Sequence, residues 1–340
     1  IRIVANVAEF GGKVGFAAAG FGVWCYVFGP LMRVVCTAFG VQLRQPWRPR
    51  FFMRIREAAS YLRYGIKTSA SQMLFQLYTN ADRHVVKYFF GETASGLYAK
   101  AYELILESVR IISVTSVEVA FPIFARLRGH PAAVEAEFIK LTRQNLLVVL
   151  PFVVLILLAA PELLTVVYGP EWAPAANAAR ILCIIGALRG VSALAPPLLD
   201  GLGHPQSTLK YMLVATSILP LFFWISATLF GDRMGFLSVA VAWAVGYPIA
   251  FAVLQALAFA HLGSSPWAYL RGVMGIPACM AGALVAGAIA RFLVGGTSPA
   301  VRLLTVSIAM VVTMAMLLAR FQGINLLSLM RGARKKGGAA

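Results

Sequence analysis

Long apolar runs dominate this sequence, and short polar segments rich in glycine and proline separate them. Each run has close to the roughly 20 residues that a helix needs to cross a bilayer. Turn residues fall between the runs, as they do between separate helices. The pattern therefore predicts an all-α, polytopic transmembrane bundle of about ten spans. The predicted spans are Ile3–Ala19, Phe21–Leu43, Tyr64–Phe90, Leu97–Phe124, Leu146–Tyr168, Ala175–Leu202, Tyr211–Phe230, Phe236–Leu262, Ala268–Val294 and Ala300–Phe321.

The composition supports a membrane protein. Hydrophobic residues make up 60% of the chain and charged residues only 13%, and the mean hydropathy is +0.78. Soluble domains are on average about half apolar and a quarter charged. The net charge of +17 does not indicate a nucleic-acid partner, because the basic residues cluster in short segments between apolar runs. Such clusters mark cytoplasmic loops, and they make acidic lipid head groups a second expected partner.

The basic clusters also predict a topology. Every second polar segment is rich in arginine and lysine, beginning with positions 44–56 and 126–143 and ending with the tail at 331–336. Only Arg291 and Arg302, which flank the last loop, break this alternation. Since positive loops stay in the cytoplasm, both ends of the chain and the 44–56 segment are predicted to be cytoplasmic.

Catalytic and metal-binding patterns are absent from the sequence. It contains no His-Glu-x-x-His helix and no Gly-x-Ser-x-Gly elbow, and its four cysteines lie singly in apolar runs. Gly91 and Gly96 have the glycine spacing of a phosphate loop, but Leu97 occupies the position that requires lysine. We therefore predict no catalytic residue, no metal and no cofactor, and expect energy to come from a partner or an ion gradient.

Charged residues inside two predicted spans are the strongest functional indication. Asn80, Asp82 and Arg83 lie in the stretch from Thr68 to Phe90, which otherwise is typical of a helix inside a bilayer. An ionised side chain there costs about 2.5 to 3.5 kcal/mol, and such groups usually face a partner or a water-filled path. Asp82 and Arg83 are adjacent, so they point about 100° apart on a helix and cannot simply neutralise each other. The next span adds Lys100, Glu103, Glu107 and Arg110.

We predict that these residues line a polar cavity. Asn80, Arg83, Lys100 and Arg110 are the expected contacts of an anionic solute, and Asp82, Glu103 and Glu107 are expected ion-relay or partner groups. Asp82 could also pair with Lys100 or Arg110. The alternative is that the charges form structural salt bridges or extend to the head groups near helix ends. We favour that alternative for Arg63, Lys67, Lys87, Glu118 and Arg320.

Two further segments carry local predictions. Arg180, Arg189 and Asp200 add polarity to the sixth span, where Pro196-Pro197 should kink or break the helix. The stretch from Pro131 to Arg143 is predicted to be a short amphipathic helix that extends the fourth span.

Seven short motifs lie along the chain between Gly20 and Gly203. They are Gly20-Phe21-Gly22-Val23-Trp24, Pro46-Trp47-Arg48-Pro49, Asn80-x-Asp82-Arg83, Gly96-Leu97-Tyr98-Ala99-Lys100-Ala101-Tyr102, Phe121-Pro122, Tyr168-Gly169-Pro170-Glu171-Trp172-Ala173-Pro174-Ala175 and Gly201-Leu202-Gly203. In this order and spacing they resemble the polysaccharide-transporter branch, which includes the O-antigen flippases, of the multidrug/oligosaccharidyl-lipid/polysaccharide flippase superfamily.

The resemblance implies a domain organisation. Family members have two six-helix lobes around a central cavity, often followed by two further helices, and by its motifs this chain begins at the fifth helix. The expected domains are the last two helices of the N-terminal lobe (1–46), a basic cytoplasmic linker (47–60), the six-helix C-terminal lobe (61–262), two additional helices (263–325) and a basic cytoplasmic tail (326–340).

The resemblance also implies a function. Members move undecaprenyl-pyrophosphate-linked oligosaccharide across the bacterial inner membrane by alternating access, for O-antigen, capsule or exopolysaccharide synthesis. A coupling ion (H⁺ or Na⁺) and the polysaccharide polymerase and chain-length machinery are expected partners. Three alternatives stay open: a drug or small-molecule antiporter of the same superfamily, a membrane glycan polymerase or ligase, and a non-transporting scaffold. An antiporter of cationic drugs would favour carboxylates in the cavity, and a polymerase or ligase would favour a large periplasmic loop.

Overall fold

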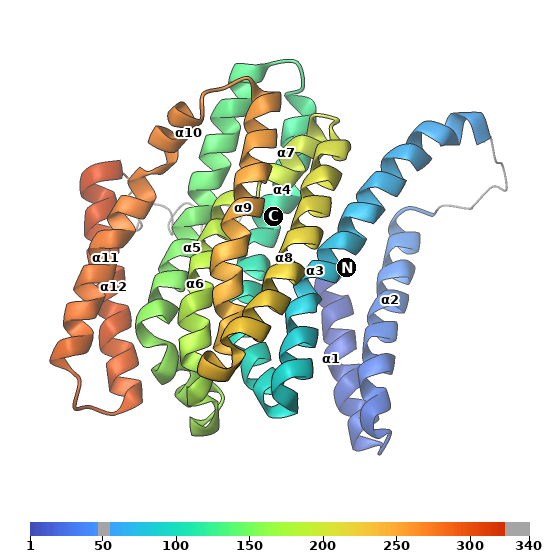
Figure 1. Cartoon of the computed structure of the whole chain (residues 1–340). Coiled ribbons are helices and arrows are strands. Elements are labelled where there is room, and N and C mark those ends of the chain that lie inside the picture. Colours follow the sequence, from blue (N-terminus) through green and yellow to red (C-terminus); the bar gives the residue numbers. More distant parts are fainter. Residues whose placement is uncertain (47–54, 324–340) are drawn as a thin grey trace. The chain divides into compact units, whose positions relative to one another are not determined.

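The computed structural model describes residues 1–46 and 55–323, except for the side chains of Arg2, of residues 55–61, and of Arg63 and Tyr64. Every regular element in these two ranges is a helix, so the all-α prediction is confirmed (Figure 1). The predicted linker up to position 54 and the predicted basic tail lie outside the described residues. From Ile55 onward the predicted linker is already helical.

The chain divides into two compact units, Ile1–Ser60 and Tyr61–Ala340. In the first unit, α1 (Arg2–Ala18) and α2 (Cys25–Arg44) form a helical hairpin through the short 3-10 helix η1 (Gly22–Trp24). Glu9 holds this hairpin together, because its carboxylate accepts from Lys13 Nζ at 2.6 Å and lies 3.3 Å from Arg33 Nε. The assignment of these helices to an N-terminal lobe remains a prediction.

The helix α3 (Ile55–Tyr102) contributes its residues from Tyr61 onward to the second unit, and its backbone breaks at Gly91. Gly91 has φ 82° and ψ −176°, a conformation that residues with a Cβ rarely adopt. The break separates two helical segments at the place where the sequence predicts a turn between spans. A π-helical turn, η2 (Glu103–Glu107), then leads into α4 (Ser108–Arg126).

The next helices correct one prediction and confirm another. The polar stretch after Pro131 does not extend the fourth span, because it is the first part of α5 (Pro131–Val167). Proline has a fixed φ and no N–H, so it suits the first turn of a helix and starts α5 here. The sixth span does break at its prolines: α6 (Ala176–Ser192) ends and α7 (Ala195–Gly201) restarts with them in its first turn. The 3-10 helix η3 (Pro170–Ala175) precedes α6.

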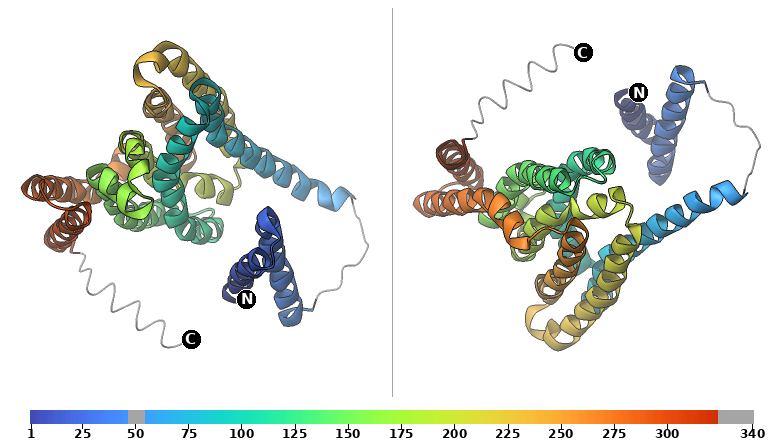
Figure 2. Two further views of the ribbon diagram at one scale, coloured as in Figure 1. Left: turned by 90° about the horizontal axis from the view of Figure 1, so that it is seen from below. Right: turned by 90° about the horizontal axis from the view of Figure 1, so that it is seen from above.

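The remaining helices complete the second unit. They are α8 (Pro205–Met234), α9 (Leu237–Leu262), α10 (Pro266–Val273), α11 (Gly275–Leu293) and α12 (Pro299–Gln322). α8 packs on α9, α6 lies between α5 and α9, and α11 and α12 form a pair set against α5 (Figure 2). Glycine permits the close α5–α6 approach, since a Cβ at Gly190 would lie 2.7 Å from Val149 Cγ1.

Fewer helices than the ten predicted are long and apolar enough, by length and composition alone, to cross a membrane. Among the described residues, seven helices have the length and composition to cross a membrane: Gly22–Arg44, Pro131–Val167, Pro170–Gly201, Pro205–Met234, Leu237–Leu262, Gly275–Leu293 and Pro299–Gln322. The other three predicted spans are helical, but α1 has only 17 residues and the two spans built from α3, η2 and α4 carry the charges described above. The chain is a multi-pass membrane protein.

Candidate functional site

A cavity of about 490 Å³ lies between α3, η2, α4 and α6 in the second unit. Its volume falls within the roughly 300 to 1,000 Å³ that is usual for small-molecule sites. It is lined by Phe75, Gln76, Thr79, Asn80, Arg83, Ala99, Tyr102, Glu103, Glu107, Arg110 and Arg189. The structure thus brings five of the seven predicted site residues, Asn80, Arg83, Glu103, Glu107 and Arg110, to one cavity. Asp82 and Lys100 do not line it.

Arg83 reaches this cavity without a carboxylate partner. Its guanidinium lies over the ring of Tyr102, 4.9 Å from the ring centroid. Its Nε atom is buried and has no hydrogen-bond partner. No Asp or Glu among the residues with described side chains lies within ion-pair distance of it. A cation–π contact holds the group but leaves its N–H donors unused, so Arg83 retains the capacity to bind an anion.

Arg189 is a second such arginine, contributed by α6. Its guanidinium lies 4.9 Å from the Trp243 ring centroid, 5.6 Å from that of Tyr247 and 5.9 Å from that of Tyr102. Nη1 donates to the Tyr102 hydroxyl at 3.3 Å, whereas Nη2 is buried and has no partner. Arg83 and Arg189 therefore share the Tyr102 ring and face the same cavity.

The sequence analysis treated Arg189 only as added polarity in the sixth span. The available signal was an arginine within an apolar run, the same signal that identified Arg83. What the sequence could not supply was the packing that brings α6 beside α3.

The other charges that line the cavity are paired. The Arg110 guanidinium forms an ion pair with Glu107, and its Nε donates to Glu107 Oε2 at 3.0 Å. Glu103 accepts from Lys100 Nζ at 2.8 Å. Both glutamates lie on η2, and π-helical turns of this kind occur often at functional sites. With both carboxylates occupied, the cavity retains the two unpaired positive charges of Arg83 and Arg189.

Asp82 faces the protein interior. It is fully buried, and its carboxylate accepts from Tyr98 Oη at 2.8 Å, Trp243 Nε1 at 2.8 Å and the Arg83 backbone N–H at 2.7 Å. The predicted divergence of Asp82 and Arg83 is confirmed. The suggested pairing of Asp82 with Lys100 or Arg110 is wrong, because those cations bind Glu103 and Glu107. Asp82 thus binds the indole against which the Arg189 guanidinium lies, and its role as an ion relay or partner remains a prediction.

Lys100 lies beside an aromatic pair rather than in the cavity. Its ammonium is 4.8 Å from the Tyr168 ring centroid and 6.0 Å from that of Trp172, both in the segment around η3. Lys100 forms an ion pair with Glu103, and its role as an anion contact remains a prediction.

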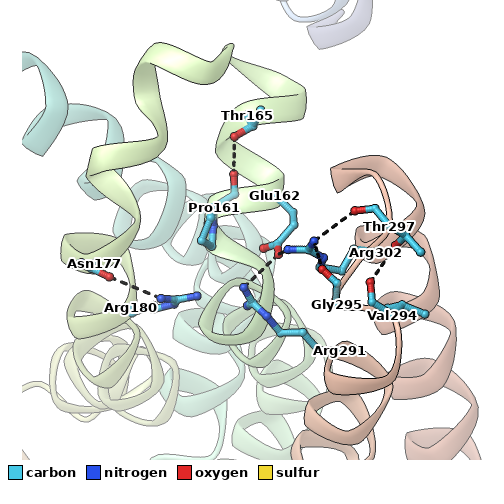
Figure 3. A network of polar contacts seen from close by, with 10 residues as sticks. All are labelled: Pro161, Glu162, Thr165, Asn177, Arg180, Arg291, Val294, Gly295, Thr297 and Arg302. Atoms are coloured by element: carbon cyan, nitrogen blue, oxygen red, sulfur yellow. Dashed lines mark hydrogen bonds and ion pairs between the residues drawn. The ribbon is translucent and has the colours of Figure 1, made fainter.

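A separate charge cluster joins the last two helices to α5 (Figure 3). Glu162 of α5 is only 3% exposed, and its Oε1 accepts from Arg291 Nη2 of α11 at 2.9 Å and Arg302 Nη1 of α12 at 3.1 Å. Arg302 Nη2 also donates to the carbonyl oxygens of Gly295 and Thr297, at 2.6 and 3.1 Å. These bonds explain why Arg291 and Arg302 do not follow the alternation of basic loops. Both arginines bind the buried carboxylate of Glu162.

Comparison with known proteins identifies the family. Residues 1–177 match the model of the family described as polysaccharide biosynthesis protein. The chain belongs to this family. The polysaccharide-transporter resemblance that the motifs indicated is therefore confirmed.

Three curated relatives agree with this assignment. The chain is 28% identical over 146 residues to the teichuronic acid biosynthesis protein TuaB of Bacillus subtilis (strain 168), covering 43% of this chain and 30% of that protein. It is 28% identical over 175 residues to the amylovoran biosynthesis protein AmsL of Erwinia amylovora, covering 52% and 45%. It is 24% identical over 217 residues to the lipopolysaccharide biosynthesis protein WzxC of Escherichia coli (strain K12), covering 64% and 42%. The chain thus spans less than half the length of each.

A solved structure supports the fold. The inward closed conformation of the lipid II flippase MurJ matches with a TM-score of 0.65 at 12% identity, over 93% of this chain and 66% of that one. At this identity the likeness concerns the fold alone, and it confirms the flippase-type helical architecture.

Proposed function

We propose that this family member works as a flippase for undecaprenyl-pyrophosphate-linked oligosaccharide. It would carry the head group from the cytoplasmic to the periplasmic leaflet of the bacterial inner membrane by alternating access. The polysaccharide biosynthesis relatives and the fold of a lipid II flippase support a transport role over an enzymatic one. In the proposed orientation the basic loops and both ends of the chain are cytoplasmic.

The observation that carries this proposal is the pair of arginines on Tyr102. Arg83 and Arg189 bring two positive charges without carboxylate partners to one cavity. A pyrophosphate offers several anionic oxygens, and a guanidinium binds such oxygens through paired, charge-assisted hydrogen bonds. The polar cavity wall also suits a hydrated sugar head group, while the lipid tail stays in the bilayer. A cationic drug would meet repulsion here, so the cavity favours an anion over the substrates of a drug antiporter.

The ion pairs that line the cavity suggest a second proposed function, the coupling of transport to H⁺ or Na⁺. Pyrophosphate oxygens would compete with the Glu107 carboxylate for Arg110, and a carboxylate released in this way can take up a proton or Na⁺. We therefore retain Glu103 and Glu107 as the proposed ion-coupling groups. Asp82 is proposed to position Trp243, since it is buried and bound to three donors.

Substitution of Arg83 in the native gene tests the proposal. Losing one charge-assisted contact costs about 1.5 to 3 kcal/mol, which lowers affinity roughly ten- to a hundredfold. We expect Arg83→Ala to cripple surface polysaccharide production while the protein still accumulates in the membrane. Arg83→Lys should recover only part of the output, because an ammonium lacks the planar fork of a guanidinium.

Lys87→Ala is the matched control. Lys87 lies one turn further along α3, carries the same charge, does not line the cavity and pairs with Glu92 at 2.8 Å. Its removal should leave both abundance and polymer output unchanged. Normal output from a normally expressed Arg83→Ala protein would exclude the proposed role of Arg83.

A further inference from the structure

A second polar pocket lies at the end of the second unit where three connections meet. It has a volume of about 210 Å³ and joins the α4–α5 turn, the α7–α8 turn and the end of α9. Its lining residues are Arg128, Gly129, Pro131, Val134, Leu202, His204, His261 and Leu262. All three connections belong to the set that loop charge predicts to be cytoplasmic. The pocket shares no lining residue with the proposed substrate cavity.

Two histidines form one wall of this pocket. The rings of His204 and His261 are stacked, with centroids 4.0 Å apart and an interplanar angle of 16°. Gln206 Nε2 lies 3.3 Å from His204 Nδ1, and Ser207 Oγ lies 2.8 Å from His261 Nε2. An amide nitrogen can only donate, so His204 Nδ1 accepts and the proton of the neutral ring is on Nε2. That N–H has no partner among the described residues and remains available to a ligand.

Arg128 supplies a cation at the same place. Its guanidinium lies against the backbone of Gly203, where a Cβ would be only 2.7 Å from Arg128 Nη2. Gly203 has φ +85°, so the turn favours glycine. No carboxylate among the described residues lines this pocket. The nearest acidic residue along α7, Asp200, accepts a hydrogen bond from Thr208 Oγ1 at 2.8 Å and is not part of the lining.

Helix ends of both polarities meet at the pocket. α5 and α8 start there with a proline, and the histidines that precede them, His130 and His204, form no side-chain cap. α4, α7 and α9 end there, so the positive ends of two helix dipoles are opposed by the negative ends of three. Lys210 on α8 contributes a further positive charge near His261. The preference for an anion therefore comes from the side chains of Arg128, His204 and His261, because the helix dipoles at the pocket oppose one another.

We propose that Arg128, His204 and His261 form a phosphate-binding pocket, separate from the substrate cavity. The ligand is a phosphate group, carried either by an anionic lipid head group of the adjacent leaflet or by a soluble phosphate compound. A guanidinium together with imidazole N–H donors suits phosphate oxygens, and the small volume matches a head group rather than an oligosaccharide. The site does not depend on the function proposed for Arg83 and Arg189.

Chemical modification of the histidines tests the pocket. The full chain is placed in nanodiscs of phosphatidylcholine and treated with diethyl pyrocarbonate, and the rate of carbethoxylation is read for each histidine by peptide mass spectrometry. One arm adds inorganic pyrophosphate, and the other replaces part of the lipid with phosphatidylglycerol. We expect at least one arm to slow modification of His204 and His261 relative to the same chain without pyrophosphate or phosphatidylglycerol. Protection only by pyrophosphate identifies a soluble phosphate ligand, and protection by phosphatidylglycerol identifies a lipid head group.

Three variants make the test specific. Arg128→Ala should raise the ligand concentration needed for protection by about tenfold, the loss expected for one charge-assisted bond. Arg126→Ala removes an exposed arginine of the same turn that does not line the pocket, so protection should persist. Arg83→Ala should also leave protection intact, which separates this site from the cavity. The inference is overturned if neither arm protects the two histidines, if Arg128→Ala changes nothing, or if Arg83→Ala abolishes protection.

Discussion

Two pairs of arginines in the second unit differ in what they touch. Arg83 and Arg189 rest on the Tyr102 ring, and neither has a carboxylate partner among the residues with described side chains. Arg291 and Arg302 share the buried carboxylate of Glu162. A guanidinium on an aromatic face keeps its charge free of a carboxylate, whereas Arg291 and Arg302 each donate to Glu162, although Arg302 Nε has no hydrogen-bond partner among the described residues. The contrast separates arginines that can bind a ligand from arginines that hold helices together.

The contrast extends to the helices that each pair joins. The Glu162 cluster links α5, α11 and α12, and Arg302 also binds carbonyls of the α11–α12 loop, so the cluster fixes the last two helices (Figure 3). The Tyr102 pair joins α3 to α6 through one ring and borders an open cavity. Removing a residue should therefore lower stability in the first case and ligand binding in the second.

The largest effect is expected from Glu162→Ala. This change removes the shared carboxylate of Arg291 and Arg302, whose side chains are 27% and 25% exposed. Breaking a fully buried pair typically costs about 3 to 5 kcal/mol, and the partial exposure of both arginines places the expected cost at the lower end, about 3 kcal/mol. We expect low abundance in the membrane and a lower unfolding temperature in detergent. Replacing all three residues by leucine should recover much of the stability, because no uncompensated charge remains. A triple variant as unstable as Glu162→Ala would show that the ionic contacts are not the cause.

A smaller loss of stability is expected from Asp82→Asn. Tyr98 Oη and Trp243 Nε1 both donate to Oδ2, and the Arg83 backbone N–H donates to Oδ1. Because the amide nitrogen of asparagine can only donate, at least one of these three donors loses its acceptor, at a cost of about 1 to 3 kcal/mol. Thermal unfolding measures this cost, and polymer output per molecule should stay close to normal. A stable Asp82→Asn protein whose transport no longer depends on pH or Na⁺ would instead support the relay role that the sequence suggested.

Arg189→Ala is expected to weaken substrate binding with little effect on abundance. Loss of one charge-assisted contact corresponds to about 1.5 to 3 kcal/mol, similar to the effect expected at Arg83. If both arginines bind the same pyrophosphate, the double variant should lose less than the sum of the two single effects, since their contributions are coupled. If the two single variants' losses of binding free energy for inorganic pyrophosphate add up to the loss in the double variant, the arginines belong to two independent sites.

The smallest effect is expected from Glu137→Ala. Glu137 and Lys140 form an i,i+3 pair at 2.8 Å in which Lys140 is 60% exposed. Exposed pairs of this kind contribute about 0.5 kcal/mol or less. Abundance and output should therefore match the unchanged protein. A clear loss in either would show that charge near this end of α5 matters for a reason other than the pair.

The sequence predicted much of the fold because its signals are local. Apolar runs located the helices, the gap between the predicted spans ending at Phe90 and beginning at Leu97 marked the break in α3, and Pro196-Pro197 marked the restart at α7. Four charged residues and Asn80, in α3, η2 and α4, indicated five of the residues that line the cavity. The sequence did not predict that Arg189 would line the same cavity or that the Asp82 carboxylate would bind Trp243. It also did not predict that Glu162 would bind two arginines more than 120 positions away in the sequence. These depend on which helices pack together, which no local pattern encodes.

The most direct test of the contrast compares Arg83→Ala with Arg291→Ala, each introduced in the native gene. The measurement is surface polysaccharide output divided by membrane abundance of the protein. For Arg83→Ala we predict normal abundance and an output per molecule reduced at least about tenfold. For Arg291→Ala we predict reduced abundance with an output per molecule close to normal, since Arg302 still binds Glu162. The account is contradicted if the two variants lose output per molecule to the same degree, or if Arg83→Ala loses only abundance.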